Sequence, residues 1–160
     1  MKRSPTPIPE GYHTVTPYLS TRNCPEAVEF YKRAFGAKEL GRMPGPDGRI
    51  VHADIQIGDS HIFLCDEFPE MGSKSPETLG GSPVSLLLYV DDVDSFFKTA
   101  VQAGGVAVEE PKDMFWGDRW AVLRDPFGHT WQIATHVEDV TPEEMEKRSA
   151  SFFTATQPHS

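Results

Sequence analysis

The feature that most constrains the fold of this chain is an internal repeat. The segment FYKRAFG at residues 30–36 matches FFKTAVQAGG at 96–105, and GRIVHADIQIGDSHIFL from Gly48 matches GDRWAVLRDPFGHTWQI from Gly117. A repeated pattern of this length outranks any single motif as a predictor of architecture. We therefore expect two copies of one supersecondary unit.

Each copy has the pattern of a βαβββ unit. A β-branched or apolar strand comes first, a helix with apolar residues at helical spacing follows, and three strands complete the unit. We expect the first helix to be capped by Asn23 or Cys24 and to end at Gly36, and the second to be capped by Asp91. The expected strands lie at 14–20, 36–43, 50–57 and 60–65 in the first copy, and at 84–90, 106–111, 119–125 and 130–136 in the second.

These elements predict an α+β fold in which two βαβββ modules form a cup-shaped mixed β-sheet with the helices outside. The capping box at Thr141 predicts a helix after the last strand. The expected organisation is a flexible N-terminal arm (1–11), the first module (12–66), a linker (67–83), the second module (84–136), and a C-terminal helix and tail (137–160).

Composition excludes several classes of function. The chain has 15 Lys and Arg against 24 Asp and Glu, a net charge of −9, and no basic run that would neutralise a nucleic-acid backbone. No segment approaches the roughly 18 apolar residues of a membrane span. Cys24 and Cys65 are too far apart for a C-x-x-C motif. We expect a soluble, cytoplasmic protein without disulfides, thiolate-bound metal, nucleic acid or membrane partners.

Several phrases, in order, resemble the vicinal oxygen chelate superfamily, which includes glyoxalase I, bleomycin-resistance proteins and extradiol dioxygenases. They are TPYLS, EAVEFYKRAFGAKE, HADIQIGDS, MFWGDR and DPFGHTWQIATH, and they look most like the PhnB-like branch over about residues 12–150. The resemblance implies the glyoxalase/bleomycin-resistance/dioxygenase fold and a homodimer. Whether modules pair within a chain or swap between chains is left open.

Metal-using members of that superfamily carry His, Glu or Gln ligands on strands that face the cleft. By position, the resemblance places the four ligands at Val15 or Thr16, Ile62, Ser85 and Gln132. Tight binding of a divalent ion needs three or four strong donors, which this set lacks. We therefore expect no cofactor. The alternative is an off-pattern divalent-metal site made of His52, Asp54 and Gln132.

The candidate ligand-binding residues form two groups. His52 and Asp54 share one face of a strand, so an imidazole and a carboxylate both look into the cleft, either as an acid–base pair or as a hydrogen-bonded structural pair. The second group is built around a Gly-Asp-Arg turn, and its aromatic rings and guanidinium suit a planar or anionic ligand, although core packing also explains the aromatics. It consists of Phe115, Trp116, Arg119 and Trp120, with Gln132 completing the candidate site.

Three other histidines have simpler interpretations. His129 follows a turn glycine and is expected to bond a backbone group, while His61 and His136 lie at strand ends and are expected to be exposed. The sequence thus predicts a protein that binds a small organic molecule in a cleft between βαβββ modules. The alternatives are a divalent-metal-dependent lyase, isomerase or dioxygenase and a protein that sequesters an antibiotic or toxin. The ligand and the presence of catalysis are not fixed.

Overall fold

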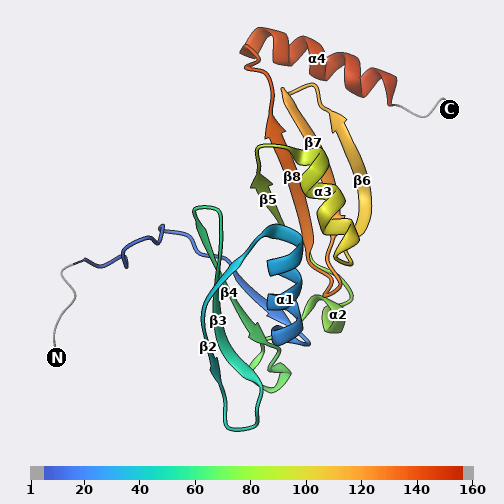
Figure 1. The fold of residues 1–160 in the computed structure, drawn as a ribbon. Helices are drawn as coiled ribbons and strands as arrows, with labels where there is room; N and C mark the ends of the chain where they lie inside the picture. The colour runs from blue at the N-terminus through green and yellow to red at the C-terminus, as the bar shows by residue number, and fades with distance from the viewer. Residues whose placement is uncertain (1–5, 157–160) are drawn as a thin grey trace.

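The computed structural model describes residues 6–156 and contains two successive βαβββ modules (Figure 1). The first consists of β1 (Tyr18–Thr21), α1 (Cys24–Phe35), β2 (Lys38–Pro44), β3 (Ile50–Ile57) and β4 (Ser60–Asp66). The second consists of β5 (Ser85–Tyr89), α3 (Val93–Gln102), β6 (Val106–Asp113), β7 (Asp118–Arg124) and β8 (Thr130–His136). Between them lie the 3-10 helix η1 (Pro69–Met71) and α2 (Pro76–Leu79), and α4 (Pro142–Ala155) comes last. The predicted α+β class and the repeat are confirmed.

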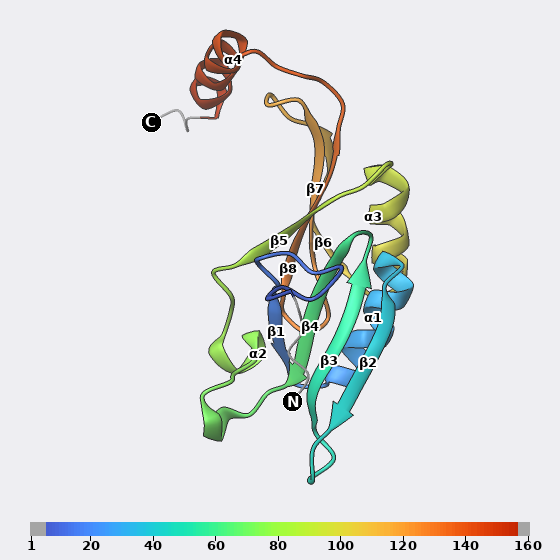
Figure 2. The ribbon, with the colours of Figure 1, turned by 90° about the vertical axis from the view of Figure 1, so that its left-hand side faces the viewer.

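Each module forms its own four-stranded mixed sheet, in the orders β1-β4-β3-β2 and β5-β8-β7-β6. In each module, the strand that comes first in the chain runs parallel to the strand that comes last: β1 is parallel to β4, and β5 is parallel to β8. The other neighbouring strands are antiparallel. The registers correspond, because Ala53 lies opposite Leu64 as Ala121 lies opposite Ile133. These four side chains are fully buried on the faces that α1 and α3 cover. Figure 2 shows both helices on one side of the molecule, so the other face of each sheet has no helix of its own module against it.

The helices begin where side chains satisfy their first backbone N–H groups. Asn23 caps α1 and Thr141 caps α4, as the sequence predicts. The cap of α3 is Asp92 rather than the predicted Asp91, one residue further along. Within residues 6–156, no helix is long and apolar enough to cross a membrane.

The predicted linker, residues 67–83, contains local structure. It holds both short helices, and the carboxylate of Glu67 accepts hydrogen bonds of 2.8 Å from the Ser75 backbone and from the Thr78 hydroxyl. Ser75 is fully buried. The segment is therefore a folded connection rather than an unstructured spacer.

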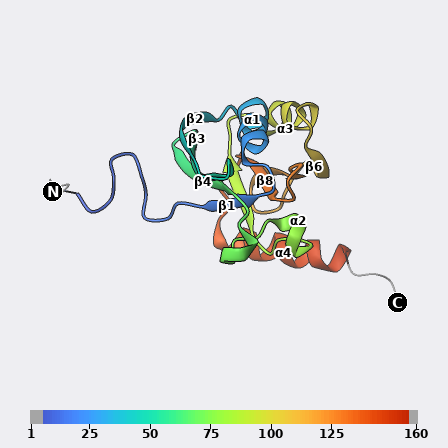
Figure 3. The same ribbon diagram turned by 90° about the horizontal axis from the view of Figure 1, so that it is seen from below.

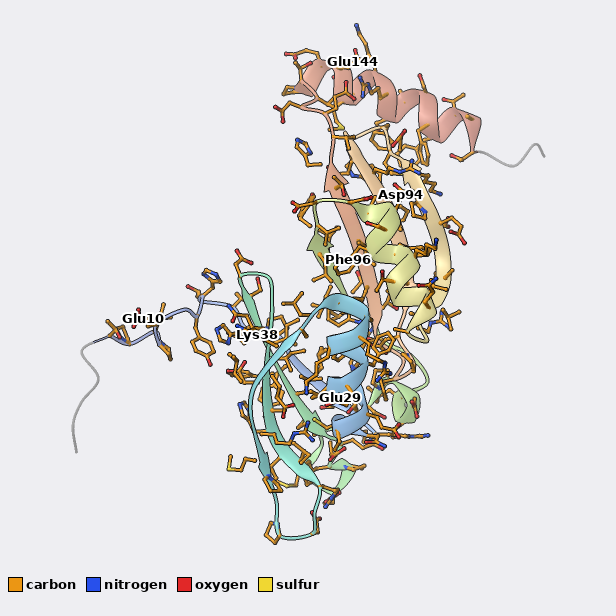
Figure 4. All side chains as sticks on the ribbon, in the orientation of Figure 1. Glu10, Glu29, Lys38, Asp94, Phe96 and Glu144 are labelled. Carbon is orange, nitrogen blue, oxygen red and sulfur yellow. The ribbon has the colours of Figure 1, made fainter. Side chains whose placement is uncertain are left out.

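The two modules pack together through their helices and through one turn. Phe35 of α1 stacks on Phe96 of α3 with ring centroids 5.6 Å apart, and it also contacts Trp131, which belongs to the second module. Figure 4 labels Phe96 where α3 approaches α1. Tyr31 donates a hydrogen bond to Asp125 in the turn between β7 and β8. The helix-covered sides of both modules thus share one hydrophobic core, and their other faces stay open.

His129 lies in the same turn and also joins the modules. Its Nε2 is 3.0 Å from the backbone oxygen of Ser20, on β1. The sequence correctly predicts a backbone partner for this histidine, but that partner lies 109 residues away in the other module. The histidine therefore fastens the modules together and is not directed at either open sheet face.

Helix α4 lies on the side of the second sheet opposite α3 (Figure 3). Arg148 connects the helix to the segments next to the sheet through an ion pair with Glu138 and a 3.4 Å hydrogen bond to the Phe115 carbonyl, while its ion pair with Glu144 lies within the helix. Phe152 adds a ring contact to Phe115, with centroids 5.2 Å apart. None of the side chains of α4 is buried. The helix therefore stands at the margin of the open face and does not close it.

Candidate functional site

The open face of the first sheet carries the two polar residues predicted from β3. His52 and Asp54 lie on one face, as the period of a strand requires, while Ala53 and Ile55 are buried under α1. The two do not form a pair. His52 is bonded through Nδ1 to the Tyr18 hydroxyl at 2.9 Å, and its ring lies edge-on to a neighbouring phenylalanine. The structure therefore gives each residue its own partners.

Asp54 is the centre of a cluster that the sequence does not indicate. His61 Nδ1 lies 3.0 Å from one carboxylate oxygen, and the hydroxyl of Tyr12 donates to the other. The Tyr12 ring stacks on the His61 ring with centroids 3.8 Å apart. The hydrogen bond to Asp54, burial and the negative charge of Asp54 together raise the pKa of Tyr12. The exposure expected for His61 is wrong, because its side chain is only 8% exposed beneath the tyrosine.

Gln132 is held at both ends of its amide on the open face of the second sheet. The indole Nε1 of Trp120 donates to its Oε1 at 2.9 Å, and its Nε2 donates to the Ser85 hydroxyl at 2.7 Å. The three residues form a line across β7, β8 and β5. Leu87 and Tyr89 flank the line on β5 and are 41% and 64% exposed. This face thus offers an ordered amide between aromatic and apolar groups.

An aromatic row continues from Trp120 to α4. Trp116 lies 5.9 Å from Trp120 between ring centroids, and Phe115 lies 5.1 Å from Trp116. Phe152 and Phe153 of α4 extend the row beyond Phe115. The sequence predicts the first three aromatics, but it misses the α4 phenylalanines because the contact depends on where the helix lies.

Arg119 does not join the aromatic residues. Its guanidinium forms ion pairs with Asp94 of α3, at 2.6 Å, and with Asp113, and it lies on the helix side of the sheet. Strand alternation places its neighbour Trp120 on the opposite face. The guanidinium lowers the pKa of Asp94 through the hydrogen bonds that it donates. Arg119 and Trp120 thus lie on opposite faces of the sheet, and the role of Arg119 in binding an anionic ligand stays a prediction.

The side chains at the metal positions implied by the resemblance do not form a set of donors. Ile62 is 3% exposed and points to the core side of the sheet. The first-module counterpart of Gln132 is Phe63, because Phe63 pairs with Asp54 on β3 just as Gln132 pairs with Val122 on β7. The placement at Ile62 is therefore off by one residue. Gln132 already uses both ends of its amide. A divalent ion would find no carboxylate or imidazole among these positions.

The alternative metal set of His52, Asp54 and Gln132 does not form a site either. His52 and Asp54 lie on the first sheet and are bonded to tyrosines, while Gln132 lies on the second. Within residues 6–156, no group of three or more His, Cys, Asp or Glu side chains is placed to hold a metal ion. The residues thus do not fit a divalent metal, and the expected absence of a cofactor stays a prediction for measurement.

The candidate residues therefore occupy two surfaces. His52 and Asp54, with Tyr12 and His61, belong to the first sheet, whereas the line around Gln132 and the aromatic row belong to the second. No hydrogen bond, ion pair or ring contact joins the two sets within the described part of the chain. A single copy of the protein thus presents two separate sets of candidate residues.

Comparisons with known proteins agree with this architecture. The Glyoxalase/Bleomycin resistance protein/Dioxygenase superfamily profile matches residues 12–133. An uncharacterized protein of Mycobacterium tuberculosis (strain ATCC 25618 / H37Rv) is 42% identical over 140 residues, which cover 86% of this chain and 82% of the relative. The crystal structure of TioX from Micromonospora sp. ML1 superposes with a TM-score of 0.61 and 27% identity, covering 78% of this chain and 99% of that one.

A PhnB protein from Bacillus cereus superposes with a TM-score of 0.58, covering 77% of this chain and 99% of that one. Its sequence identity is 16%, so the likeness is one of fold alone. The match of the superfamily profile, which spans both modules, and the identity to the mycobacterial relative establish the family. The chain belongs to the glyoxalase/bleomycin resistance protein/dioxygenase superfamily.

Proposed function

We propose that this protein is a homodimer that binds a small organic molecule between the open face of the first sheet of one copy and the open face of the second sheet of the other. The observation that carries the proposal is that two ordered sets of candidate residues lie on separate sheets, with no hydrogen bond, ion pair or ring contact between them in residues 6–156. A second copy brings complementary faces together and encloses a cleft of the kind that small-molecule sites need.

The exposed apolar side chains on the second sheet support a partner at this face. Leu87 and Tyr89, two residues apart on one face of β5, are 41% and 64% exposed. Clustered apolar groups on an open sheet face are typical of surfaces that another protein or a ligand covers. The same sheet provides the Gln132 amide, whose fixed orientation suits recognition of a polar group on the ligand.

We further propose that the protein belongs to the PhnB-like branch of the superfamily. The order of the phrases TPYLS, HADIQIGDS, MFWGDR and DPFGHTWQIATH supports the assignment. The cleft works without a tightly held metal, because the donors that a divalent ion requires are absent at the implied positions.

A mixed-dimer experiment tests the proposal. A thermal-shift screen of small organic molecules first supplies a ligand. Asp54→Ala and Gln132→Ala homodimers are each expected to lose binding, because every composite cleft then lacks one half. Refolding the two variants together is expected to restore one intact cleft in each mixed dimer. Isothermal titration calorimetry then detects about half a site per chain in mixed dimers separated by two different affinity tags, and about a quarter of a site per chain in the unseparated statistical mixture.

The control is Asp94→Ala, which changes a charge on α3 away from both open faces. This variant is expected to bind like the wild type. A monomer in analytical ultracentrifugation at micromolar concentration contradicts the proposal. Mixed dimers that bind no better than either parent contradict it as well.

The divalent-metal enzyme is the competing function, and metal content separates it from the proposal. We expect protein purified without chelator to contain no stoichiometric Ni, Zn, Mn or Fe, and titration with these ions to leave it unchanged. Stoichiometric metal that is lost in Gln132→Ala would favour a lyase, isomerase or dioxygenase.

The aromatic row favours sequestration as a second candidate, because rings from β7 and α4 line one margin of the second sheet. Binding of the screened ligand without turnover supports this function. Conversion of the ligand to a product, followed by NMR, contradicts it.

A further inference from the structure

The arm formed by residues 6–12 places the phenol of Tyr12 on the open face of the first sheet. Pro9 to Tyr12 form a β-turn, in which the Tyr12 backbone N–H donates to the Pro9 carbonyl at 3.1 Å. Gly11 is the third residue of the turn with φ of +85°, a conformation that glycine adopts without strain. Figure 2 shows the arm crossing in front of β4. The turn thereby directs the Tyr12 side chain back onto the sheet.

Three groups on the sheet surround the Tyr12 side chain. The imidazole of His61 provides a flat surface, with ring centroids 3.8 Å apart and planes 24° apart. Asp54 accepts the hydroxyl hydrogen, and Phe63 contacts the ring at a tilt with centroids 5.9 Å apart. A charge-assisted hydrogen bond and a stacked ring are together specific for a planar ring that carries a hydroxyl.

The carboxylate of Asp54 is suited to one further donor. His61 Nδ1 lies 3.0 Å from Oδ1 and 3.3 Å from Oδ2, and Oδ2, which now accepts from the Tyr12 hydroxyl, is the place for an incoming hydroxyl. Asp54 is only 9% exposed with Tyr12 in place. If the tyrosine leaves, this carboxylate is uncovered beside a stacking surface, and a ligand hydroxyl of the same geometry restores the lost contacts.

The arm has room to move and an open hollow beside it. Residues 6–11 are exposed. An open surface hollow of about 460 Å³ lies against Tyr12 and Phe63, and Pro7, Ile8 and Pro9 also line it. A ligand larger than one ring can therefore place its phenol on the sheet and its remainder under the arm.

We propose that Asp54, His61 and Phe63 form a recognition site for a hydroxylated aromatic ring, which Tyr12 occupies in the free protein and leaves when the ligand binds. The inference rests on the proposed function, since it takes the open face of the first sheet as a ligand surface. It adds the chemical class of the ligand and makes Tyr12 an internal competitor. The ligand binds only the molecules from which Tyr12 has left. The apparent association constant is therefore that of the open site multiplied by the fraction of molecules in which the site is open.

The test uses p-cresol, which is the tyrosine side chain as a free molecule. Binding is followed through the His61 ring signals and the backbone amide signals of residues 9–12 in NMR spectra of the full-length protein. We expect p-cresol to shift the His61 signals of the wild type and to release the arm amides. We also expect p-cresol to bind Tyr12→Gly at least about tenfold more tightly, because the competitor is gone. Toluene, which lacks the hydroxyl, is expected to bind Tyr12→Gly more weakly than p-cresol.

Tyr12→Phe is the matched variant, since it keeps the stacked ring and removes only the hydrogen bond to Asp54. Its affinity for p-cresol is expected to fall between those of the wild type and Tyr12→Gly. Binding to Tyr12→Gly but not to the wild type, up to the solubility limit of p-cresol, overturns the proposal, because Tyr12 is then a fixed part of the fold. Absence of binding to every variant with a native amide spectrum overturns it too.

These outcomes are independent of the mixed-dimer experiment, which reports on the composite cleft. If p-cresol binds as expected while mixed dimers fail, the phenol site stands and the composite cleft is lost. If mixed dimers succeed while p-cresol fails, only the proposed ligand class is lost.

Discussion

Tyr31, on α1 of the first module, donates a 2.5 Å hydrogen bond to Asp125, in the turn that precedes the last strand of the second. Asp125 is 2% exposed and also accepts from the Trp131 indole and from the backbone N–H groups of Phe127 and His129. One buried carboxylate therefore satisfies four donors, and one of them comes from the other module.

We expect Tyr31→Phe to lower the free energy of unfolding by about 1–3 kcal/mol, because it removes a donor from a buried charged group without creating a cavity. Urea denaturation measures the change. Tyr18→Phe is the matched control, since its hydrogen bond to His52 lies on the open face and its loss is expected to cost less than about 1 kcal/mol. Equal losses in the two variants contradict the role given to Asp125.

The repeat supplies a second matched pair, in its two aligned glycines. Both have positive φ, +85° at Gly48 and +99° at Gly117, but a Cβ at Gly117 would lie 2.2 Å from the Glu138 carbonyl oxygen, whereas none of the surrounding atoms lies within 4 Å of one at Gly48. Gly48→Ala is expected to cost about 1–2 kcal/mol for its backbone conformation alone. Gly117→Ala must also move the chain before α4, so we expect a loss of more than about 3 kcal/mol. Thermal denaturation with equal losses for both variants contradicts this prediction.

His136 joins β8 to the segment before α4 and gives a pH-dependent contact. Its Nε2 and Nδ1 each lie 2.8 Å from a carboxylate, Asp139 and Asp118 respectively, and both hydrogen bonds raise the pKa of the imidazole. A raised folded-state pKa makes the contact fully stabilising below pH of about 6.5, and the contribution is lost as the pH rises through the folded pKa.

We expect an NMR titration to place the His136 pKa above about 6.5 and Asp139→Asn to lower it. The effect on the melting temperature is expected to be small, because the side chain is 53% exposed and solvent screens the pairs. Titration of His136 at or below the ordinary value contradicts the geometry.

Cys24 is expected to be inert in the folded protein. Burial, followed by the nearby charge of Asp66, raises the pKa of its thiol to about 12, and the residue is 1% exposed. The thiolate that alkylating reagents attack is then reduced by about a thousandfold relative to an ordinary thiol. In a Cys65→Ser variant, iodoacetamide at pH 8 is expected to label Cys24 only after unfolding in urea, as mass spectrometry shows. Rapid labelling of the native variant contradicts the prediction.

The sequence by itself determined the local architecture. The repeat, the change from strand to helix periodicity and the caps at Asn23 and Thr141 predicted two βαβββ modules followed by a helix, and the structure contains them. Such signals are readable because they depend on neighbours within a few residues along the chain. The shared face of His52 and Asp54 was predictable for the same reason, since strand side chains alternate.

Only the tertiary structure decided what each candidate residue touches. Aligning Gly58 with Gly128 makes Ile62 the counterpart of Gln132, whereas the strand pairing makes it Phe63, because the two hairpin loops differ in length. A shift of one residue moves a side chain to the opposite face of its strand. The sequence places Arg119 beside the aromatic side chains, but its guanidinium forms an ion pair with Asp94 on α3, which packs against the opposite face of the sheet. Tyr12 reaches Asp54 across 42 residues of chain. Periodicity gives the direction of a side chain, whereas its partner depends on which distant segments fold against the same face.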